Sequence, residues 1–219
     1  MDFEYIRSVI PLYVEAAGLT LKIGLVGILF AIILGLFCAL TRYFKIPVLR
    51  QIVAVYTELS RNTPLLIQLF FLYFAFPLIG INFSSEQCGI IGLTFLGGSY
   101  MAETFRSSLQ TVSKVQIESA ECIGLKKSQI VIYVILPQAA AVSIPGLCAN
   151  IIFMLKETSV FSAVALADLM FVAKDLIGMD YKTDEALTLL VIAYFIILLP
   201  VSLISYFAER RLRFGQFGN

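Results

Sequence analysis

Several long apolar stretches limit the folds open to this sequence more than any other feature. A helix that crosses a membrane needs about 20 mostly apolar residues, because it rises about 1.5 Å per residue. Five segments reach or approach that length, at residues 17–40, 52–79, 89–105, 130–155 and 186–208. The chain is 59% hydrophobic and 14% charged, against roughly 45–50% and 25% in soluble domains. We therefore predict an all-α integral membrane protein, a single transmembrane domain over residues 1–219 with five transmembrane helices.

The distribution of lysine and arginine predicts how these helices face the membrane. Short cytoplasmic loops are enriched in basic residues. Basic residues gather after the first span, between the third and fourth spans and in the tail, at Arg42, Lys45, Arg50, Arg106, Lys114, Lys126, Lys127, Arg210, Arg211 and Arg213. We therefore expect the N-terminus outside and the C-terminus in the cytoplasm. Residues 159–177 hold Asp168, Lys174 and Asp175, so we expect a short helix there rather than a sixth crossing.

Several functional classes lack their usual residues in this sequence. It has no histidine, and its four cysteines form no C-x-x-C pair, so we expect no metal site and no catalytic centre. The net charge of +1 gives no sign of nucleic-acid binding. The chain lacks the G-x-x-x-x-G-K-[ST] motif that holds ATP phosphates. We expect no cofactor in this chain, and any ATP-driven activity needs a partner.

Residues 113–129, between the third and fourth spans, form the most informative loop. Ser113 and Gln116 have the spacing of a capping box, which predicts that a helix begins there. Gly124 can end that helix in a left-handed conformation. Ser128 and Gln129 can open another helix. We therefore predict two short cytoplasmic helices with a tight bend between them.

This loop resembles the cytoplasmic loop of permease subunits of ATP-binding-cassette (ABC) importers. There, E-A-A, three residues and G are followed by I-x-L-P or V-x-L-P, and this chain has Glu118, Ala120 and Gly124 at that spacing, then Val-Ile-Leu-Pro at 134–137. The branch that takes up polar amino acids also carries E-x-x-R-G-T-P-L-L-x-Q, M-L-K-[DE]-[ST]-[SA]-[LV] and a closing E-R-R-L. The matching segments here are residues 58–68, 154–160 and 209–212.

The resemblance implies a permease subunit for polar amino acids in the bacterial cytoplasmic (inner) membrane, similar to the histidine, glutamine and arginine permeases. In that family the loop is a coupling helix that docks into a groove of the ATPase. The residues that would couple here are Glu118, Ala120, Glu121, Gly124, Leu125 and Pro137. The implied partners are a dimer of ABC ATPase subunits carrying ATP and Mg, a second permease subunit, identical or related, an extracytoplasmic amino-acid-binding protein, and membrane lipid.

Two positions depart from the family pattern. Ser119 replaces the first Ala of the loop, a change between small residues that should still allow docking. Asn62 replaces the Gly of R-G-T-P, which removes a flexible point and leaves the identity of the amino acid open.

Charged residues inside the second span need an explanation, since each costs roughly 2.5–3.5 kcal/mol at the membrane centre. Glu58 and Arg61 lie three residues apart and can face each other on a helix. They form either an internal ion pair that locks the helices or part of the lining of the translocation path. Pro64 kinks the helix and frees backbone groups, and Thr63 and Gln68 flank the kink, which favours the lining.

The third and fourth spans also carry charges. Glu103 either pairs with Arg106 at the cytoplasmic edge or faces a pocket beneath the small residues 97–99. Lys156 and Glu157 are either ordinary membrane-edge charges or a pocket for a zwitterion. The family resemblance places part of the ligand site near them and favours the pocket. The predicted substrate-binding and translocation residues are Glu58, Arg61, Thr63, Gln68, Glu103, Asn150, Lys156, Glu157 and Ser159.

The main alternative is an ATP-independent secondary carrier or channel for small polar solutes. Many such carriers contain internal repeats, whereas no half-to-half repeat is visible here, and a carrier leaves residues 118–137 unexplained. An intramembrane enzyme would need a nucleophile with a base, or a metal cluster. Because five helices are too few to enclose a pathway, we predict a two-fold or pseudo-two-fold pair of permease subunits.

Overall fold

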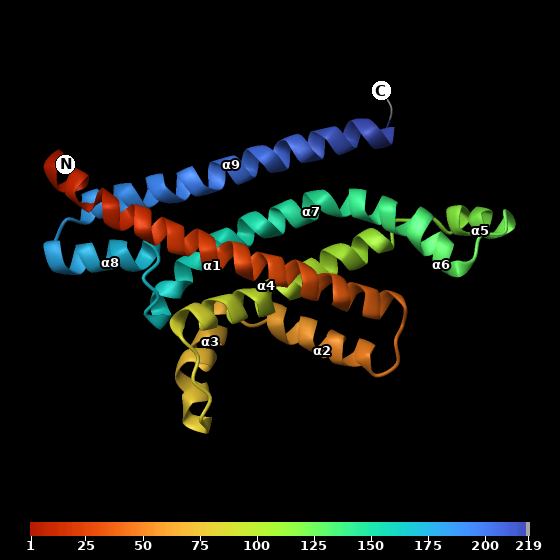
Figure 1. Ribbon diagram of the computed structural model, residues 1–219, viewed down its shortest axis with the longest axis horizontal. Helices are drawn as coiled ribbons and strands as arrows, with labels where there is room; N and C mark the ends of the chain where they lie inside the picture. Colours follow the sequence, from red (N-terminus) through yellow and green to blue (C-terminus); the bar gives the residue numbers. More distant parts are fainter. Residues whose placement is uncertain (218–219) are drawn as a thin grey trace.

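Four long helices run along the length of the molecule (Figure 1). The computed structural model describes residues 1–217, and side chains as far as Arg210. The long helices are α1 (Phe3–Tyr43), α4 (Ser85–Leu109), α7 (Leu136–Glu157) and α9 (Thr183–Phe217). The part of the chain described contains helices and turns without any β-strand, as the apolar segments predict.

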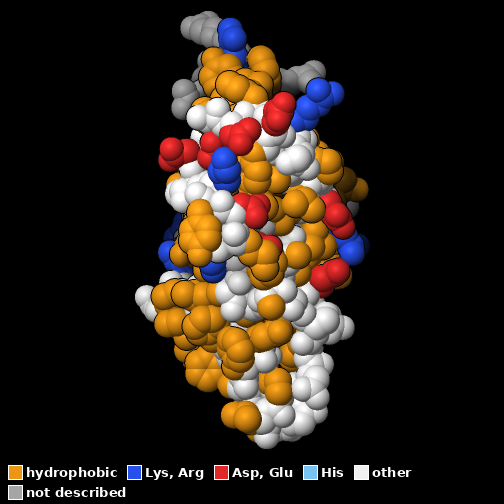
Figure 2. Space-filling model, turned by 90° about the vertical axis from the view of Figure 1, so that its left-hand side faces the viewer, with side chains coloured by type: hydrophobic (Ala, Val, Ile, Leu, Met, Phe, Trp, Pro, Cys, Tyr) orange, Lys and Arg blue, Asp and Glu red, His pale blue; other side chains and the backbone are white. Residues whose placement is uncertain are grey.

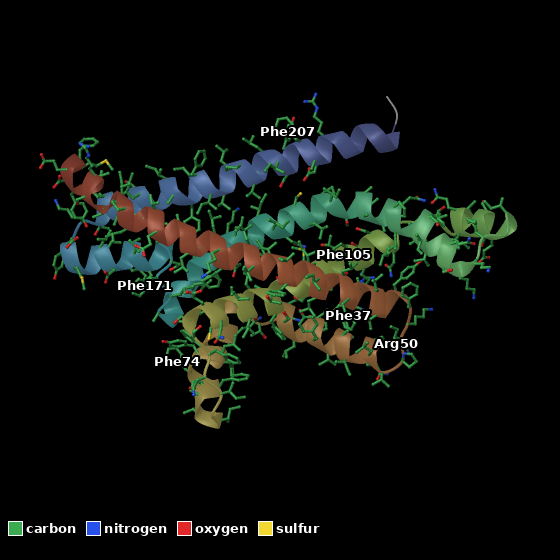
Figure 3. All side chains as sticks on the ribbon, in the orientation of Figure 1. Phe37, Arg50, Phe74, Phe105, Phe171 and Phe207 are labelled. Carbon is green, nitrogen blue, oxygen red and sulfur yellow. The ribbon has the colours of Figure 1, made fainter. Side chains whose placement is uncertain are left out.

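The second apolar segment is two helices and not one. They meet at an angle of 104°, and the second projects from the body of the molecule with Phe74 on it (Figures 1 and 3). The sequence predicted a single kinked span over 52–79; the break is sharper because residues 62–64 leave the helix. The segments are α2 (Leu49–Arg61) and α3 (Leu65–Phe70), followed by a π-helical turn Phe71–Ala75 and a 3-10 turn Phe76–Ile79.

Shorter helices lie at the two ends of the molecule. One end carries α5 (Lys114–Cys122) and α6 (Lys127–Ile130), which leads into α7 through a π-helical turn, Val131–Ile135. The other end carries α8 (Leu169–Asp180), reached from α7 through a 3-10 segment, Thr158–Val164. The expected short helix between the last two apolar segments is therefore confirmed.

Three helices of the described chain are long and apolar enough to cross a membrane, and a fourth qualifies if the bent pair α2–α3 counts as one crossing. The three are Phe3–Tyr43, Lys127–Val164 and Thr183–Arg210. α4 is not among them. Its position explains its composition, because a helix enclosed by other helices need not be apolar on every side.

α4 lies at the centre of the bundle and packs along α1, α2 and α7. Small residues allow the close approach: a Cβ added to Gly98 would lie 2.7 Å from both the Tyr56 hydroxyl and a Leu34 methyl. A separate buried apolar cluster joins α1, α3, α4 and α7, including Ile23, Leu65, Leu93, Met101, Met154 and Leu155. The small residues 97–99 thus serve helix packing.

The end with the N-terminus is tied together by polar contacts. Asp2 pairs with Lys182 at 3.1 Å, and the Tyr5 hydroxyl donates to Asp180 at 2.6 Å. The space-filling view onto this end shows acidic side chains gathered in its upper half and hydrophobic side chains over the lower, projecting part (Figure 2). The beginning of α1 is therefore fixed to the turn between α8 and α9.

Candidate functional site

A cavity of about 490 Å³ opens beside the break between α2 and α3. The break supplies one wall, while α4, α7 and the 3-10 segment supply the others. Its lining residues are Arg61, Asn62, Thr63, Pro64, Leu65, Leu66, Leu96, Tyr100, Phe153, Glu157 and Val160. Three of the predicted site residues, from segments almost 100 positions apart, therefore meet here: Arg61, Thr63 and Glu157.

Arg61 is the last residue of α2, and its guanidinium lies over the ring of Tyr100 on α4, 5.4 Å from the ring centroid. The sequence left open whether Arg61 pairs with Glu58 or lines the translocation path with it. In the structure the Asn62 side-chain amide donates to the Glu58 carboxylate at 3.3 Å. No Glu58–Arg61 ion pair occurs among the described side chains. Arg61 thus presents its charge to the cavity.

The two residues that follow α2 cap its C-terminal end with their side chains. The Asn62 amide donates to the Glu58 carbonyl at 2.8 Å, and the Thr63 hydroxyl donates to the Leu59 carbonyl at 2.8 Å. Asn62 has an ordinary φ of −93°, so glycine is not required at this position. The departure from the family pattern is therefore accommodated, and the Asn62 side chain adds a cap at the end of α2.

Glu157, the last residue of α7, also lines the cavity. Its side chain is half-buried and has no ion-pair partner among the described residues. A guanidinium on one wall and an unpaired carboxylate on another match the two charges of an α-amino acid. Arginine binds carboxylates with paired N–H donors, and a carboxylate accepts hydrogen bonds from an ammonium group.

The other predicted substrate residues lie outside the cavity lining. Glu103 pairs with Arg106 and lies 3.9 Å from Arg42. The Asn150 amide donates to Thr104 at 2.9 Å and so joins α7 to α4. Lys156 is exposed, and Ser159 is half-buried in the 3-10 segment.

The aromatic and apolar walls of the cavity were not among the residues predicted from the sequence. The rings of Tyr100 and Phe153 pack at a tilt of 52° with centroids 5.2 Å apart, and both residues line the cavity together with Leu96 and Val160. The candidates were polar or charged residues at membrane depth, and apolar or aromatic residues in a span do not stand out by polarity. The signal available was the position of Tyr100 directly after the small residues 97–99, where helices approach closely.

The predicted loop is a helical projection beyond the bundle, at the end opposite the N-terminus (Figure 1). Ser113 caps α5 by accepting from the Gln116 backbone N–H at 3.3 Å, and Gly124 ends it with a φ of +83°. Both predictions are confirmed. The prediction for the second helix was wrong in detail: Lys126, not Ser128, precedes α6, and its backbone N–H donates to Gln129 at 2.8 Å.

One face of α5 is anchored and the other is free. Ala120 is buried in an apolar cluster with Ala39, Leu109 and Ile130, and Leu125 packs against that cluster. The acidic residues Glu118 and Glu121 are exposed, as are the apolar side chains of Val115 and Ile123. Pro137 stands in the first turn of α7, just after the π-helical turn. The projection therefore offers a mixed acidic and apolar surface on a rigid base.

Comparison with known proteins places this geometry in a family context. Residues 31–214 match the family model described as "Binding-protein-dependent transport system inner membrane component". The protein named "Probable amino-acid ABC transporter permease protein PatM" of Vibrio harveyi is 32% identical over 216 residues, covering 96% of each chain. The "Probable glutamine ABC transporter permease protein GlnP" of Bacillus subtilis is 33% identical over 221 residues, 99% of this chain and 100% of that one.

Solved structures agree. The structure titled "Crystal structure of an amino acid ABC transporter with histidines" superposes with a TM-score of 0.90 at 30% identity, covering 96% of this chain and 99% of that chain. The inward-facing MetNI methionine ABC transporter superposes with a TM-score of 0.79, over 94% and 98% of the two chains. Its identity is 20%, so it supports the fold alone.

Proposed function

This chain belongs to the family of binding-protein-dependent transport system inner membrane components, and we propose that it is the permease subunit of an ATP-driven importer of polar amino acids. The observation that carries the proposal is the cavity at the α2–α3 break, which both Arg61, from the end of α2, and Glu157, from the end of α7, line. Relatives named as amino-acid and glutamine permeases support the class of substrate.

In the proposed bound state, Arg61 receives the carboxylate of the amino acid and Glu157 receives its ammonium group. Tyr100 holds the guanidinium from behind, so the charge is placed before the substrate arrives. Thr63 and Asn62 add polar groups to the lining of the same cavity. A membrane interior strengthens each of these interactions, because little water competes for the charges.

We propose that the chain is one permease domain crossing the bacterial inner membrane five times, with the N-terminus outside and the C-terminus in the cytoplasm. α4, with 25 residues, spans about 37 Å and is long enough for one of the crossings. Arg50 marks the end at which α1 turns into α2 and from which α5 and α6 project (Figure 3). This end carries the basic loops, and the opposite end carries Asp2 and Asp180, which supports the orientation.

The same proposal specifies partners. α5 and α6 would dock into an ATPase dimer that carries ATP and Mg, while a second permease subunit completes the pathway. An extracytoplasmic binding protein would deliver the amino acid at the acidic end, and lipid would cover the remaining apolar surface. The surface of α5 supports the ATPase contact, because it combines exposed Glu118 with exposed Val115 and Ile123 on a fixed base.

Mechanistically, ATP would close the ATPase dimer and draw the two coupling projections together. The spans would then rock around the cavity, exposing it in turn to the outside and the cytoplasm. In this scheme the chain is the transport component, and hydrolysis takes place on the ATPase.

The test is affinity purification from the native membrane, followed by reconstitution into liposomes. We expect a P-loop ATPase to co-purify and the reconstituted complex to take up amino acid only with ATP. Gly124→Pro should abolish ATPase recovery, because proline cannot adopt the positive φ that ends α5. Recovery of the chain alone, active without ATP, would instead establish the ATP-independent carrier or channel.

A further inference from the structure

The break between α2 and α3 leaves a backbone carbonyl in need of a donor. In a continuous helix the Ser60 carbonyl would accept from the backbone N–H of residue 64. Residue 64 is proline and has no N–H. The backbone substitutes are weak: the Thr63 N–H reaches the Ser60 carbonyl at a long 3.4 Å, and the Asn62 N–H is shared between this carbonyl and that of Glu58, to which it donates at 3.2 Å. A buried carbonyl without a good partner is costly, and more so where lipid replaces water.

The side chain of Gln68 supplies the missing donor. Its amide nitrogen donates to the Ser60 carbonyl at 3.1 Å and to the Thr63 carbonyl at 2.9 Å. The Thr63 carbonyl needs this second donor because the Ile67 backbone N–H is directed to the Pro64 carbonyl. Gln68 is 9% exposed and lies on the first turn of α3. One side chain therefore joins α3 to the end of α2 across the break.

The chemistry of this contact fixes the residue type. Both groups in front of the amide nitrogen are carbonyl oxygens, so the amide must present its N–H groups to them. The remaining atom, Oε1, is buried and has no hydrogen-bond partner among the described residues. Glutamate has the same shape and would place an acceptor against two acceptors.

We propose that Gln68 is a positioning residue that fixes the angle between α2 and α3 and thereby holds Arg61 and Thr63 on the wall of the substrate cavity. Gln68 itself does not line that cavity. The inference rests on the proposed function for its transport consequence, although the structural role of the amide can be tested without it.

The experiment measures the break angle and the transport kinetics of the same variants. Spin labels at Ile52 on α2 and Leu78 beyond α3, both exposed, report the angle as a distance in the full complex, with Cys122 and Cys148 changed to serine. We expect Gln68→Glu and Gln68→Met to broaden the distance distribution. The KM for amino-acid uptake should rise about tenfold, and basal ATP hydrolysis should stay unchanged.

Gln138→Leu is the matched control. Gln138 also donates a side-chain amide to a backbone carbonyl, that of Val134, at 3.0 Å, but on the opening turn of α7 and away from the break. This variant should change neither the distance distribution nor the KM. An unchanged distance distribution in both Gln68 variants would overturn the proposal.

A second comparison uses Pro64→Ala, which restores a backbone N–H at residue 64. If Gln68 replaces that N–H, Gln68→Met should lower the thermal stability less in the Pro64→Ala background than in the parent. An equal loss in both backgrounds would overturn the proposal, and the comparison holds even if Gln68→Glu does not fold. If the Gln68 variants change the angle between α2 and α3 but not the KM for uptake, the positioning role and the proposed substrate cavity are both wrong. If the parent complex takes up no amino acid, the proposed function alone is refuted.

Discussion

The guanidinium carbon of Arg61 lies 5.4 Å from the centroid of the Tyr100 ring, so a cation at the end of α2 rests on an aromatic face of α4. Arg61 is exposed to the cavity, and Tyr100 is half-buried beneath it. This contact orients the charge that we assign to the substrate carboxylate. It also links substrate binding to the relative position of the two helices.

Replacing either partner of this contact should weaken substrate binding. A cation on an aromatic face contributes about 1 kcal/mol, so Tyr100→Leu should raise the uptake KM roughly fivefold. Tyr100→Phe keeps the ring and should behave like the parent. Arg61→Lys should also raise the KM, because lysine lacks the planar fork that binds a carboxylate. Equal KM values for Tyr100→Phe and Tyr100→Leu would show that the aromatic ring at this position does not contribute to substrate binding through its contact with Arg61.

Glu157 should be required for substrate binding within the membrane. A hydrogen bond to a charged group contributes about 1.5–3 kcal/mol, so Glu157→Gln should raise the uptake KM by about tenfold or more. Assembly with the ATPase should remain intact. Lys156→Gln alters the neighbouring charge, which is exposed and outside the cavity, and should leave the KM unchanged. If the Lys156 variant loses binding and the Glu157 variant does not, the wall assigned to Glu157 is wrong.

Reversing the charge of Glu118 should uncouple ATP hydrolysis from transport. Glu118 is exposed on α5, where the proposed ATPase contact lies. Glu118→Lys should abolish uptake and make ATP hydrolysis independent of the amino acid and its binding protein. Asp175→Lys reverses a charge at an exposed position of α8, at the end that we assign to the binding protein, and should leave ATP hydrolysis coupled to any remaining uptake. Normal uptake by the Glu118 variant would remove the docking assignment.

Gly98 should tolerate no side chain. A Cβ there would lie 2.7 Å from both the Tyr56 hydroxyl and a Leu34 methyl, so α4 would have to move away from α1 and α2. Overpacking of this kind costs about 1–3 kcal/mol, and Gly98→Ala should lower the apparent Tm in detergent. Gly18→Ala is the control, since nothing lies within 4 Å of a Cβ at that position of α1. Similar Tm values for the two variants would contradict the close packing.

Asp168, at the start of α8, should make stability depend on pH. Burial raises the pKa of its carboxyl to about 6 from an ordinary 3.8, although the Phe171 backbone N–H opposes the shift. Lys174 and the Tyr194 hydroxyl are titratable groups whose charges interact with it. Because the folded state binds this proton more tightly than the unfolded state, its contribution is present below about pH 4 and lost as the pH rises through 6.

The corresponding variant is Asp168→Asn, which keeps the oxygen that accepts from the Phe171 N–H at 2.9 Å and removes the charge. Its apparent Tm should exceed that of the parent above pH 6, and the difference should shrink toward pH 4.5. Asp175→Asn, at an exposed position of the same helix, should follow the parent throughout. Parallel curves for Asp168→Asn and the parent would show that the buried carboxyl does not titrate in this range.

The sequence determined the helical class, the loop between the third and fourth apolar segments and the candidates Arg61, Thr63 and Glu157. These depend on local properties: the length of an apolar run, the capping of α5 by Ser113, and the positive φ of Gly124. Local properties do not depend on where the rest of the chain lies. These features could therefore be predicted from the sequence without the structure.

Only the tertiary structure decided which polar residues meet. Arg61 rests on Tyr100 and not beside Glu58, and Gln68 serves the backbone of the break rather than the cavity. These contacts arise from a 104° break and from packing between α2, α4 and α7, segments far apart in the chain. Charge and spacing along one helix cannot specify them, because the partner of a polar group is set by the helix that packs against it.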